Sequence, residues 1–209
     1  RERSFGVDPR PEAIRRGQRI FTFARNESMS HTGMFSCSTC HLEGKEDKLV
    51  WIVPEGMRQT PSLAARLKGT GPFNWNGDND VLQNNMVQTI GRLGGLGLDG
   101  QELQDLEQFM LDALIEPNNP NLSPDGLTEQ QELGKELFND PVVACGSCHV
   151  NGGGVDGKNH DVGSTSDLEA EFAKHRQEMG TDIAASEGVY NTPSLKGLWY
   201  TAPYLHDGS

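Results

Sequence analysis

The chain has 209 residues, of which 34% are hydrophobic and 36 are glycine or proline (25 and 11), so it offers little apolar material for large cores. Its net charge of −12 argues against nucleic acid or an anionic membrane surface as a partner, and no apolar run is long enough to predict a transmembrane segment. The charge is uneven: residues 1–116, the first half, carry 13 basic and 16 acidic side chains, whereas residues 117–209, the second half, carry 5 and 14.

A helix is predicted over residues 9–25. Asp8 suits the position before the first helical turn, and Pro9 suits the first position within it. Apolar and small residues then recur at helical spacing on one face, at Ile14, Gly17, Ile20 and Phe21. Residues 26–36 are polar and are expected to be irregular.

A C-x-x-C-H sequence follows at residues 37–41 and returns at residues 145–149, and the two copies use all four cysteines. A redox-active dithiol would need a preceding strand, whereas a loop is expected before each motif here. A zinc site with four cysteines would leave the adjacent histidines without a role. The motifs therefore predict covalent attachment of two haem c groups through Cys37, Cys40, Cys145 and Cys148, with His41 and His149 on the iron.

The segments around these motifs are also used twice. Residues 55–63 and 71–77 return as residues 187–195 and 202–208. The first helix returns as well, with Gly134, Leu137 and Phe138 in place of Gly17, Ile20 and Phe21. This order of helix, C-x-x-C-H, T-P-S-L and P-aromatic indicates a duplicated domain.

The elements between the repeated segments are less uniform. Residues 49–53 fit either a short strand or the wall of a haem pocket, and residues 81–90 are predicted as a helix. A closing helix is predicted from Asp99 to just before Pro117, with Leu103, Leu106, Met110 and Ala113 in register.

The second half opens with a capping box formed by Thr128 and Gln131. Between His149 and Thr192 it has a longer excursion than the first half has. There Ser166 and Glu169 form another capping box, which begins a helix with a predicted packing face. That face consists of Leu168, Phe172, His175 and Met179.

We therefore predict a mainly α fold with two tandem cytochrome c-like domains, each wrapped around one haem. The first covers residues 1–117, a linker rich in proline and asparagine covers 118–126, and the second covers 127–209. The second domain has no counterpart of the closing helix. Because its opening helix would expose an apolar face, we expect either a longer natural chain or another polypeptide to cover the second haem domain. The start at Arg1 likewise suggests a mature or trimmed product.

The motifs T-P-S-L and A-P-Y-x-H-D-G-S resemble those of the bacterial dihaem cytochrome c peroxidase superfamily, which includes the dihaem enzyme that matures methylamine dehydrogenase. The sequences G-P-F-N-W-N-G-D and R-L-G-G-L-G-L are most similar to members fused to a β-propeller. The resemblance places Trp75 between the two haems, where it would aid electron transfer.

The resemblance leaves the sixth iron ligands open. For the first haem the candidates are Met86 and, less favoured, Met57. The family's methionine for the second haem lies beyond Ser209, and Met179 and His175 are weaker substitutes.

The resemblance also implies a possible calcium site that uses the carbonyls of Thr201 and Pro203, although Gln59 stands where the family has asparagine. Peroxidases of the family carry a glutamate in the loop matching residues 91–100, where this chain has only Asp99, and no histidine stands at the position of the family's displaceable distal ligand.

Two functions follow from the motifs and the resemblance. One is an enzyme, similar to cytochrome c peroxidase, that moves electrons between two haems for peroxide reduction or substrate oxidation. The other is a non-enzymatic electron-transfer module of a larger redox protein or complex. The acidic second half suits a basic small electron carrier, such as a cytochrome or a copper protein. Because haem is attached in this way after export, we expect a periplasmic or otherwise extracytoplasmic location.

Overall fold

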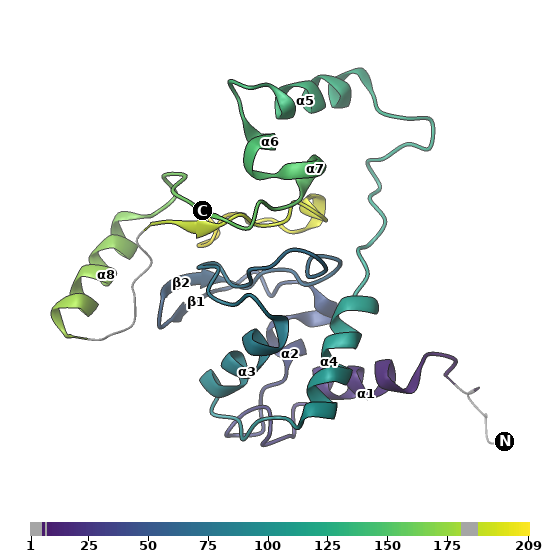
Figure 1. Cartoon of the computed structure of the whole chain (residues 1–209), viewed down its shortest axis with the longest axis vertical. Coiled ribbons are helices and arrows are strands. Elements are labelled where there is room, and N and C mark those ends of the chain that lie inside the picture. The colour runs from purple at the N-terminus through teal and green to yellow at the C-terminus, as the bar shows by residue number, and fades with distance from the viewer. Residues whose placement is uncertain (1–5, 7, 181–187) are drawn as a thin grey trace.

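The computed structural model describes residues 6, 8–180 and 188–209. Helices dominate these ranges, and the strands within them form two short antiparallel pairs, β1 with β2 and β3 with β4 (Figure 1). In chain order, the α-helices and strands are α1 (Glu12–Thr22), α2 (Cys37–Cys40), β1 (Val50–Val53), β2 (Gly56–Gln59), α3 (Leu82–Arg92), α4 (Gly100–Asp112), α5 (Glu129–Asn139), α6 (Cys145–Cys148), α7 (Val150–Gly153), β3 (Asn159–His160), α8 (Asp167–Glu178) and β4 (Tyr190–Asn191). Short 3₁₀ turns cover Leu42–Gly44 and Leu198–Tyr200.

The core of the first half lies where α1 crosses α4. A methyl group on Gly17 would lie 2.0 Å from the carbonyl oxygen of Asp105, so only glycine allows the two backbones to approach this closely. Arg16 Nε donates to Asp105 Oδ2 at 2.5 Å beside this contact. Buried apolar side chains complete the core, namely Ile14, Phe21, Leu63, Leu67, Leu82, Met86, Leu106, Phe109, Met110 and Leu114.

Three predicted element boundaries can be compared with the structure. The prediction that the first helix starts at Pro9 was wrong: α1 starts at Glu12, because the Asp8 carboxylate accepts from the backbone and the guanidinium of Arg10 instead of capping a helix. The helix predicted over residues 81–90 is confirmed as α3. Asp99 caps α4 as predicted.

Residues 49–53, which the sequence could assign either to a strand or to a haem-pocket wall, mostly form strand β1. Strand β1 pairs with β2 as a hairpin, with Val50 opposite Gln59 and Val53 opposite Gly56. The hairpin brings Arg58 and Gln59 to buried positions, whereas Val50 and its neighbours in β1 stay largely exposed.

The internal repeat is visible in the backbone. Equivalent turns use the left-handed region in both halves, at Glu43 and Asn151, Asn74 and Leu205, and Gly77 and Gly208. After each C-x-x-C-H turn a similar hydrogen bond forms: Leu63 N–H donates to the Gly44 carbonyl at 2.8 Å, and Leu195 N–H donates to the Gly153 carbonyl, one position further from its turn, at 2.9 Å. The segments that repeat in the sequence therefore also repeat in their backbone conformation.

The two halves meet through reciprocal contacts between equivalent positions. The backbone N–H of Gln59 donates to the His206 carbonyl at 2.6 Å, and that of Asn191 donates to the Trp75 carbonyl at 2.8 Å. Gln59 is the counterpart of Asn191, and Trp75 is the counterpart of His206. The halves are therefore related by an approximate two-fold axis that passes between Trp75 and His206.

Helix α5 is the counterpart of α1 but has no helix packed across it within the described ranges. Figure 1 shows it at the far end of the molecule from α1–α4. It contains no buried residue, and Leu133 and Leu137 are about half exposed. A methyl group on Gly134 would meet no atom within 4 Å, in contrast to Gly17. No described helix combines the length and the apolar character that crossing a membrane requires.

The packing face predicted for α8 was wrong. Leu168 and Met179 are 64% and 60% exposed, whereas the buried residues of this helix are Glu169 and Arg176. Ser166 does cap the helix, accepting from the backbone of Glu169. The helix turns its polar side inward because Glu169 pairs with a buried cation, Arg58, on β2.

Candidate functional site

Both C-x-x-C-H segments fold into the same single helical turn. The turn is α2 in the first half and α6 in the second. The backbone N–H of His41 donates to the Cys37 carbonyl at 2.8 Å, and that of His149 donates to the Cys145 carbonyl at 3.0 Å. Each turn therefore presents two thiols and one imidazole from adjacent positions.

The cysteines and histidines of these turns are suited to haem attachment. All four cysteines are free thiols, and burial raises the pKa of Cys37 to about 12. Burial lowers the pKa of His41 to about 4, so its imidazole is neutral and can bind a metal. In His41 and in His149 the Nδ1 atom is buried without a hydrogen-bond partner. A buried polar atom of this kind is costly unless a ligand or a metal uses the ring.

A cavity of about 400 Å³ adjoins the second turn. Cys148 and His149 lie in its wall, together with Leu195 from the T-P-S-L segment. The first half contributes to the same wall through Gln59 and Trp75. The free thiols, the unpartnered Nδ1 atoms of the two histidines and this cavity fit a covalently attached haem, and the cavity reaches the boundary between the halves.

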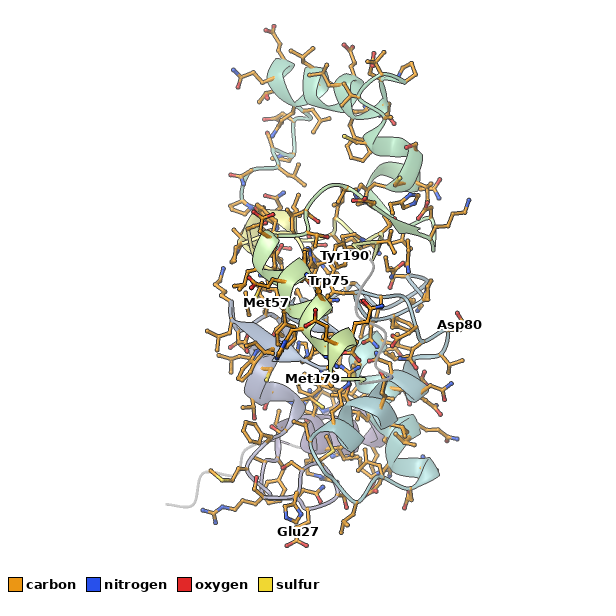
Figure 2. The ribbon with its side chains drawn as sticks, turned by 90° about the vertical axis from the view of Figure 1, so that its left-hand side faces the viewer. Glu27, Met57, Trp75, Asp80, Met179 and Tyr190 are labelled. Atoms are coloured by element: carbon orange, nitrogen blue, oxygen red, sulfur yellow. The ribbon has the colours of Figure 1, made fainter. Side chains whose placement is uncertain are left out.

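Trp75 lies on that boundary, near the middle of the molecule and close to Tyr190 (Figure 2). Its indole Nε1 donates to the Gln59 carbonyl at 2.9 Å. Its ring meets the His206 ring edge-on, with centroids 6.4 Å apart and an interplanar angle of 77°. The side chain is thus fixed between the halves, which suits the predicted role between two haems. That role stays a prediction.

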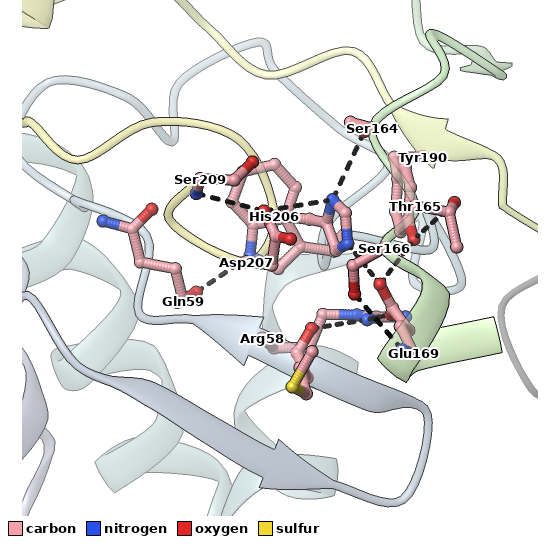
Figure 3. A network of polar contacts seen from close by, with 12 residues as sticks. Arg58, Gln59, Ser164, Thr165, Ser166, Glu169, Tyr190, His206, Asp207 and Ser209 are labelled. Carbon is pink, nitrogen blue, oxygen red and sulfur yellow. Dashed lines mark hydrogen bonds and ion pairs between the residues drawn. The ribbon is translucent and has the colours of Figure 1, made fainter. Parts of the chain in front are cut away.

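A buried polar network beside Trp75 was not predicted from the sequence (Figure 3). At its centre, the Glu169 carboxylate accepts from Arg58 Nη1 at 2.6 Å and from the Tyr190 hydroxyl at 3.2 Å, and it lies 2.5 Å from His206 Nε2. Glu169 and His206 are 3% and 1% exposed. One carboxylate from α8 therefore connects a cation of the first half with two rings of the second.

The sequence contained one signal for this network. Arg58 is the repeat counterpart of Tyr190, just as Trp75 is the counterpart of His206, so an axis between the repeats would bring all four together. The capping box predicted for Ser166 and Glu169 concealed the fifth member, because it assigned the Glu169 carboxylate to the start of α8. Only half of that box forms: Ser166 accepts from the Glu169 backbone, whereas the Glu169 carboxylate joins the network.

The structure separates the candidate distal ligands. Met86 is 6% exposed and lies in the core of the first half, in the cluster against which Cys37 also packs. Met57 is half-buried on β2. His175 and Met179 are exposed on α8 and do not line the described cavity, so the structure does not bring them to His149.

The residues around the predicted calcium carbonyls do not fit calcium. Gln59 Nε2 donates to the Pro203 carbonyl at 2.9 Å, and Lys48 Nζ donates to the neighbouring Ala202 carbonyl at 2.5 Å. Arg66 Nη2 donates to Thr201 Oγ1 at 3.1 Å. Calcium needs a shell of oxygen ligands, whereas this segment is surrounded by an amide donor and two cations.

Asp99 is also committed elsewhere. Its Oδ1 accepts from the Glu102 backbone at 2.8 Å, and the Glu102 carboxylate accepts in return from the Asp99 backbone. Asp99 is therefore accounted for as a residue that stabilises the start of α4.

Comparisons with known proteins point to cytochrome c-like relatives. A family model described as "RoxA-like, cytochrome c-like" matches residues 189–209. Hydrazine synthase subunit gamma of Kuenenia stuttgartiensis is 25% identical over 94% of this chain and 66% of its own length. The methylamine utilization protein MauG of Methylorubrum extorquens is 26% identical over 95% of this chain and 65% of its own length. The chain thus spans just under two thirds of these two relatives.

Solved structures show the same fold. A Kuenenia stuttgartiensis hydrazine synthase structure superimposes with a TM-score of 0.73 at 23% identity, over 99% of this chain and 77% of the compared chain. The diheme peroxidase BthA of Burkholderia thailandensis gives a TM-score of 0.60 at 18% identity, over 96% of this chain and 69% of its own. The described chain has a mainly helical cytochrome c-like fold with two C-x-x-C-H turns, and its sequence and fold are similar to those of the dihaem cytochrome c peroxidase/MauG superfamily.

Proposed function

We propose that the chain carries electrons between two covalently attached haems, for peroxide reduction or for oxidation of a substrate. The position of Trp75 supports this best: it belongs to the first half, yet it lines the cavity that contains His149. The indole donates to the Gln59 carbonyl, and the Trp75 backbone carbonyl accepts from the Asn191 N–H, so both halves hold this residue in place. When bound, the haems would supply the redox chemistry.

The chain's own residues have distinct tasks in this proposal. Cys37 and Cys40 would hold one haem, and Cys145 and Cys148 the other, with His41 and His149 as the proximal ligands. Met86 remains our candidate for the distal ligand of the first haem, because it shares a buried cluster with Cys37.

A second candidate function is electron transfer without catalysis, as a module of a larger complex. One observation favours it: the relative matched over 94% of this chain is, by its name, a subunit. The capping role of Asp99 points the same way, because the loop before α4 then has no free carboxylate for acid–base catalysis.

Location and redox partner follow from the same proposal. Haem attachment of this type places the protein outside the cytoplasm, in the periplasm or an equivalent compartment. The acidic second half would attract a basic electron carrier, such as a small cytochrome or a copper protein.

Peroxide turnover by the protein carrying both haems separates the two functions. An enzyme should consume hydrogen peroxide in proportion to the reduced small cytochrome supplied, and a Met86→Ala variant should keep or raise that rate by opening an iron site. A module should show no turnover above that of free haem, while still exchanging electrons with the carrier.

A further inference from the structure

Tyr190 has an unusual hydroxyl partner. The side chain is 6% exposed, and its hydroxyl donates to Glu169 Oε2 at 3.2 Å. The hydroxyls of Tyr200 and Tyr204 contact an uncharged hydroxyl and a backbone carbonyl instead. Tyr190 thus differs from these two tyrosines because its hydroxyl contacts a carboxylate.

The partner carboxylate forms a buried ion pair. Glu169 is buried, and Arg58 Nη1 lies 2.6 Å from its Oε1, which stabilises the negative form. The other oxygen, Oε2, is the one that faces the Tyr190 hydroxyl. Arg58 thus engages one carboxylate oxygen, while the other contacts the Tyr190 hydroxyl and lies 2.5 Å from His206 Nε2.

The Tyr190 ring is also part of a continuous aromatic contact. It stacks on His206 with centroids 3.8 Å apart and an interplanar angle of 14°, and His206 contacts Trp75. Tyr190 and Trp75 both line the cavity that contains His149. The Tyr190 ring therefore adjoins the cavity and is connected to Trp75 through the ring of His206.

We propose that Tyr190 is a redox-active side chain that loses an electron toward the second haem site while passing its phenolic proton to Glu169. The O–H bond of Tyr190 breaks, a neutral phenoxyl radical remains, and a new O–H bond forms at Glu169 Oε2. The electron would pass to the second haem after a peroxide-class oxidant has oxidised it. The natural oxidant in this step is therefore the one named in the proposed function, on which the step rests.

Proton transfer is what makes this oxidation feasible inside the protein. Without an acceptor, oxidation would leave a phenol radical cation, which is a far stronger acid than the phenol. With Glu169 as acceptor, the added positive charge is carried by Arg58, which also donates to the Met57 and Glu55 carbonyls. With Glu169 in place the radical is neutral, and the positive charge of Arg58 remains beside His206 and a neutral carboxyl. The repeat shows that this arrangement is specific to the second half, because the first half has Arg58 at the position of Tyr190.

The experiment uses a photo-generated ruthenium(III) polypyridyl oxidant, so it does not depend on peroxide chemistry. The parent is the protein with both haems and the substitutions Tyr200→Phe and Tyr204→Phe, which leave Tyr190 as the remaining tyrosine. Flash oxidation followed by freeze-quenching and electron paramagnetic resonance should give a phenoxyl spectrum, and Tyr190→Phe in the same parent should abolish it. Glu169→Gln should slow radical formation by about a hundredfold, a typical loss on removing a general base. The parent rate should fall in deuterated water.

The outcomes are decisive in both directions. A phenoxyl signal that depends on Tyr190 and Glu169 supports the proposal. A parent without the signal, or a Glu169→Gln variant that forms it at the parent rate, overturns the proposal. Interhaem electron transfer measured in the same samples tests the proposed function separately, since it can persist when the phenoxyl radical does not form.

Discussion

Trp75 and His206 occupy equivalent positions in the two repeats and meet at the boundary, with ring centroids 6.4 Å apart. The backbone carbonyl of Trp75 accepts from the N–H of Asn191, and the backbone carbonyl of His206 accepts from the N–H of Gln59. Each carbonyl thus accepts from the opposite half. Duplicated loops therefore form the boundary by pairing with each other. The two side chains differ at this shared position, which gives the boundary an indole on one side and an imidazole bound to a carboxylate on the other.

The first prediction concerns the indole. Trp75→Phe should keep both haems but slow electron transfer between them at least about tenfold, which corresponds to about 1.4 kcal/mol in activation free energy. The reason is that phenylalanine fills less of the boundary and cannot donate to the Gln59 carbonyl. Pulse radiolysis of the protein carrying both haems measures the rate.

Trp51 supplies the matched control, because it is 41% exposed on β1. Trp51→Phe should leave the transfer rate unchanged. Equal rates in Trp75→Phe and the unaltered protein would reduce Trp75 to a packing residue.

Local signals in the sequence predicted much of the fold. Short-range rules suffice for caps, so Asp99, Thr128 and Ser166 cap their helices as predicted. The repeated C-x-x-C-H segments also form equal turns, because five adjacent residues determine that geometry. The wrong prediction for the start of α1 shows the limit of such rules, because the Asp8 carboxylate accepts from Arg10 instead of capping the helix.

Long-range polar pairing was not predictable in the same way. Helical spacing pointed to Leu168 and Met179 as the inward face of α8, yet the helix buries Glu169. Its partner Arg58 lies 111 positions earlier in the chain, where periodicity gives no information about it. An ion pair across the two halves thus decided the orientation that apolar spacing failed to predict.

The second prediction compares equivalent phenylalanines on α1 and α5. Phe21 is 1% exposed under α4, so Phe21→Ala should lower the free energy of unfolding by about 4 kcal/mol. Phe138→Ala should lower it by only about 1 kcal/mol, because no described helix covers α5. Chemical denaturation of the 209-residue chain with haem attached measures both values.

Equal losses would mean that the α5 face is covered in the protein itself. With unequal losses, we propose that a helix of the α4 kind, not among the described residues, covers the face around Gly134 and Leu137. The space above Gly134 supports this, since the equivalent space above Gly17 is filled by the α4 backbone.

The third prediction concerns calcium. A chelator should leave the thermal midpoint and the interhaem transfer rate unchanged, because Lys48 and Gln59 already donate to the Ala202 and Pro203 carbonyls. Scanning calorimetry with and without a calcium-selective chelator checks this. A fall in the midpoint that added calcium reverses would show that the metal displaces these donors.

The most direct test of the account is the mass of the protein produced in cells that can mature c-type cytochromes. Denatured protein should have the mass of the chain plus two haems, and serine substitution of both Cys145 and Cys148 should remove one haem while leaving the one held by Cys37 and Cys40. A chain that carries no haem under these conditions, or zinc in its place, would contradict the account.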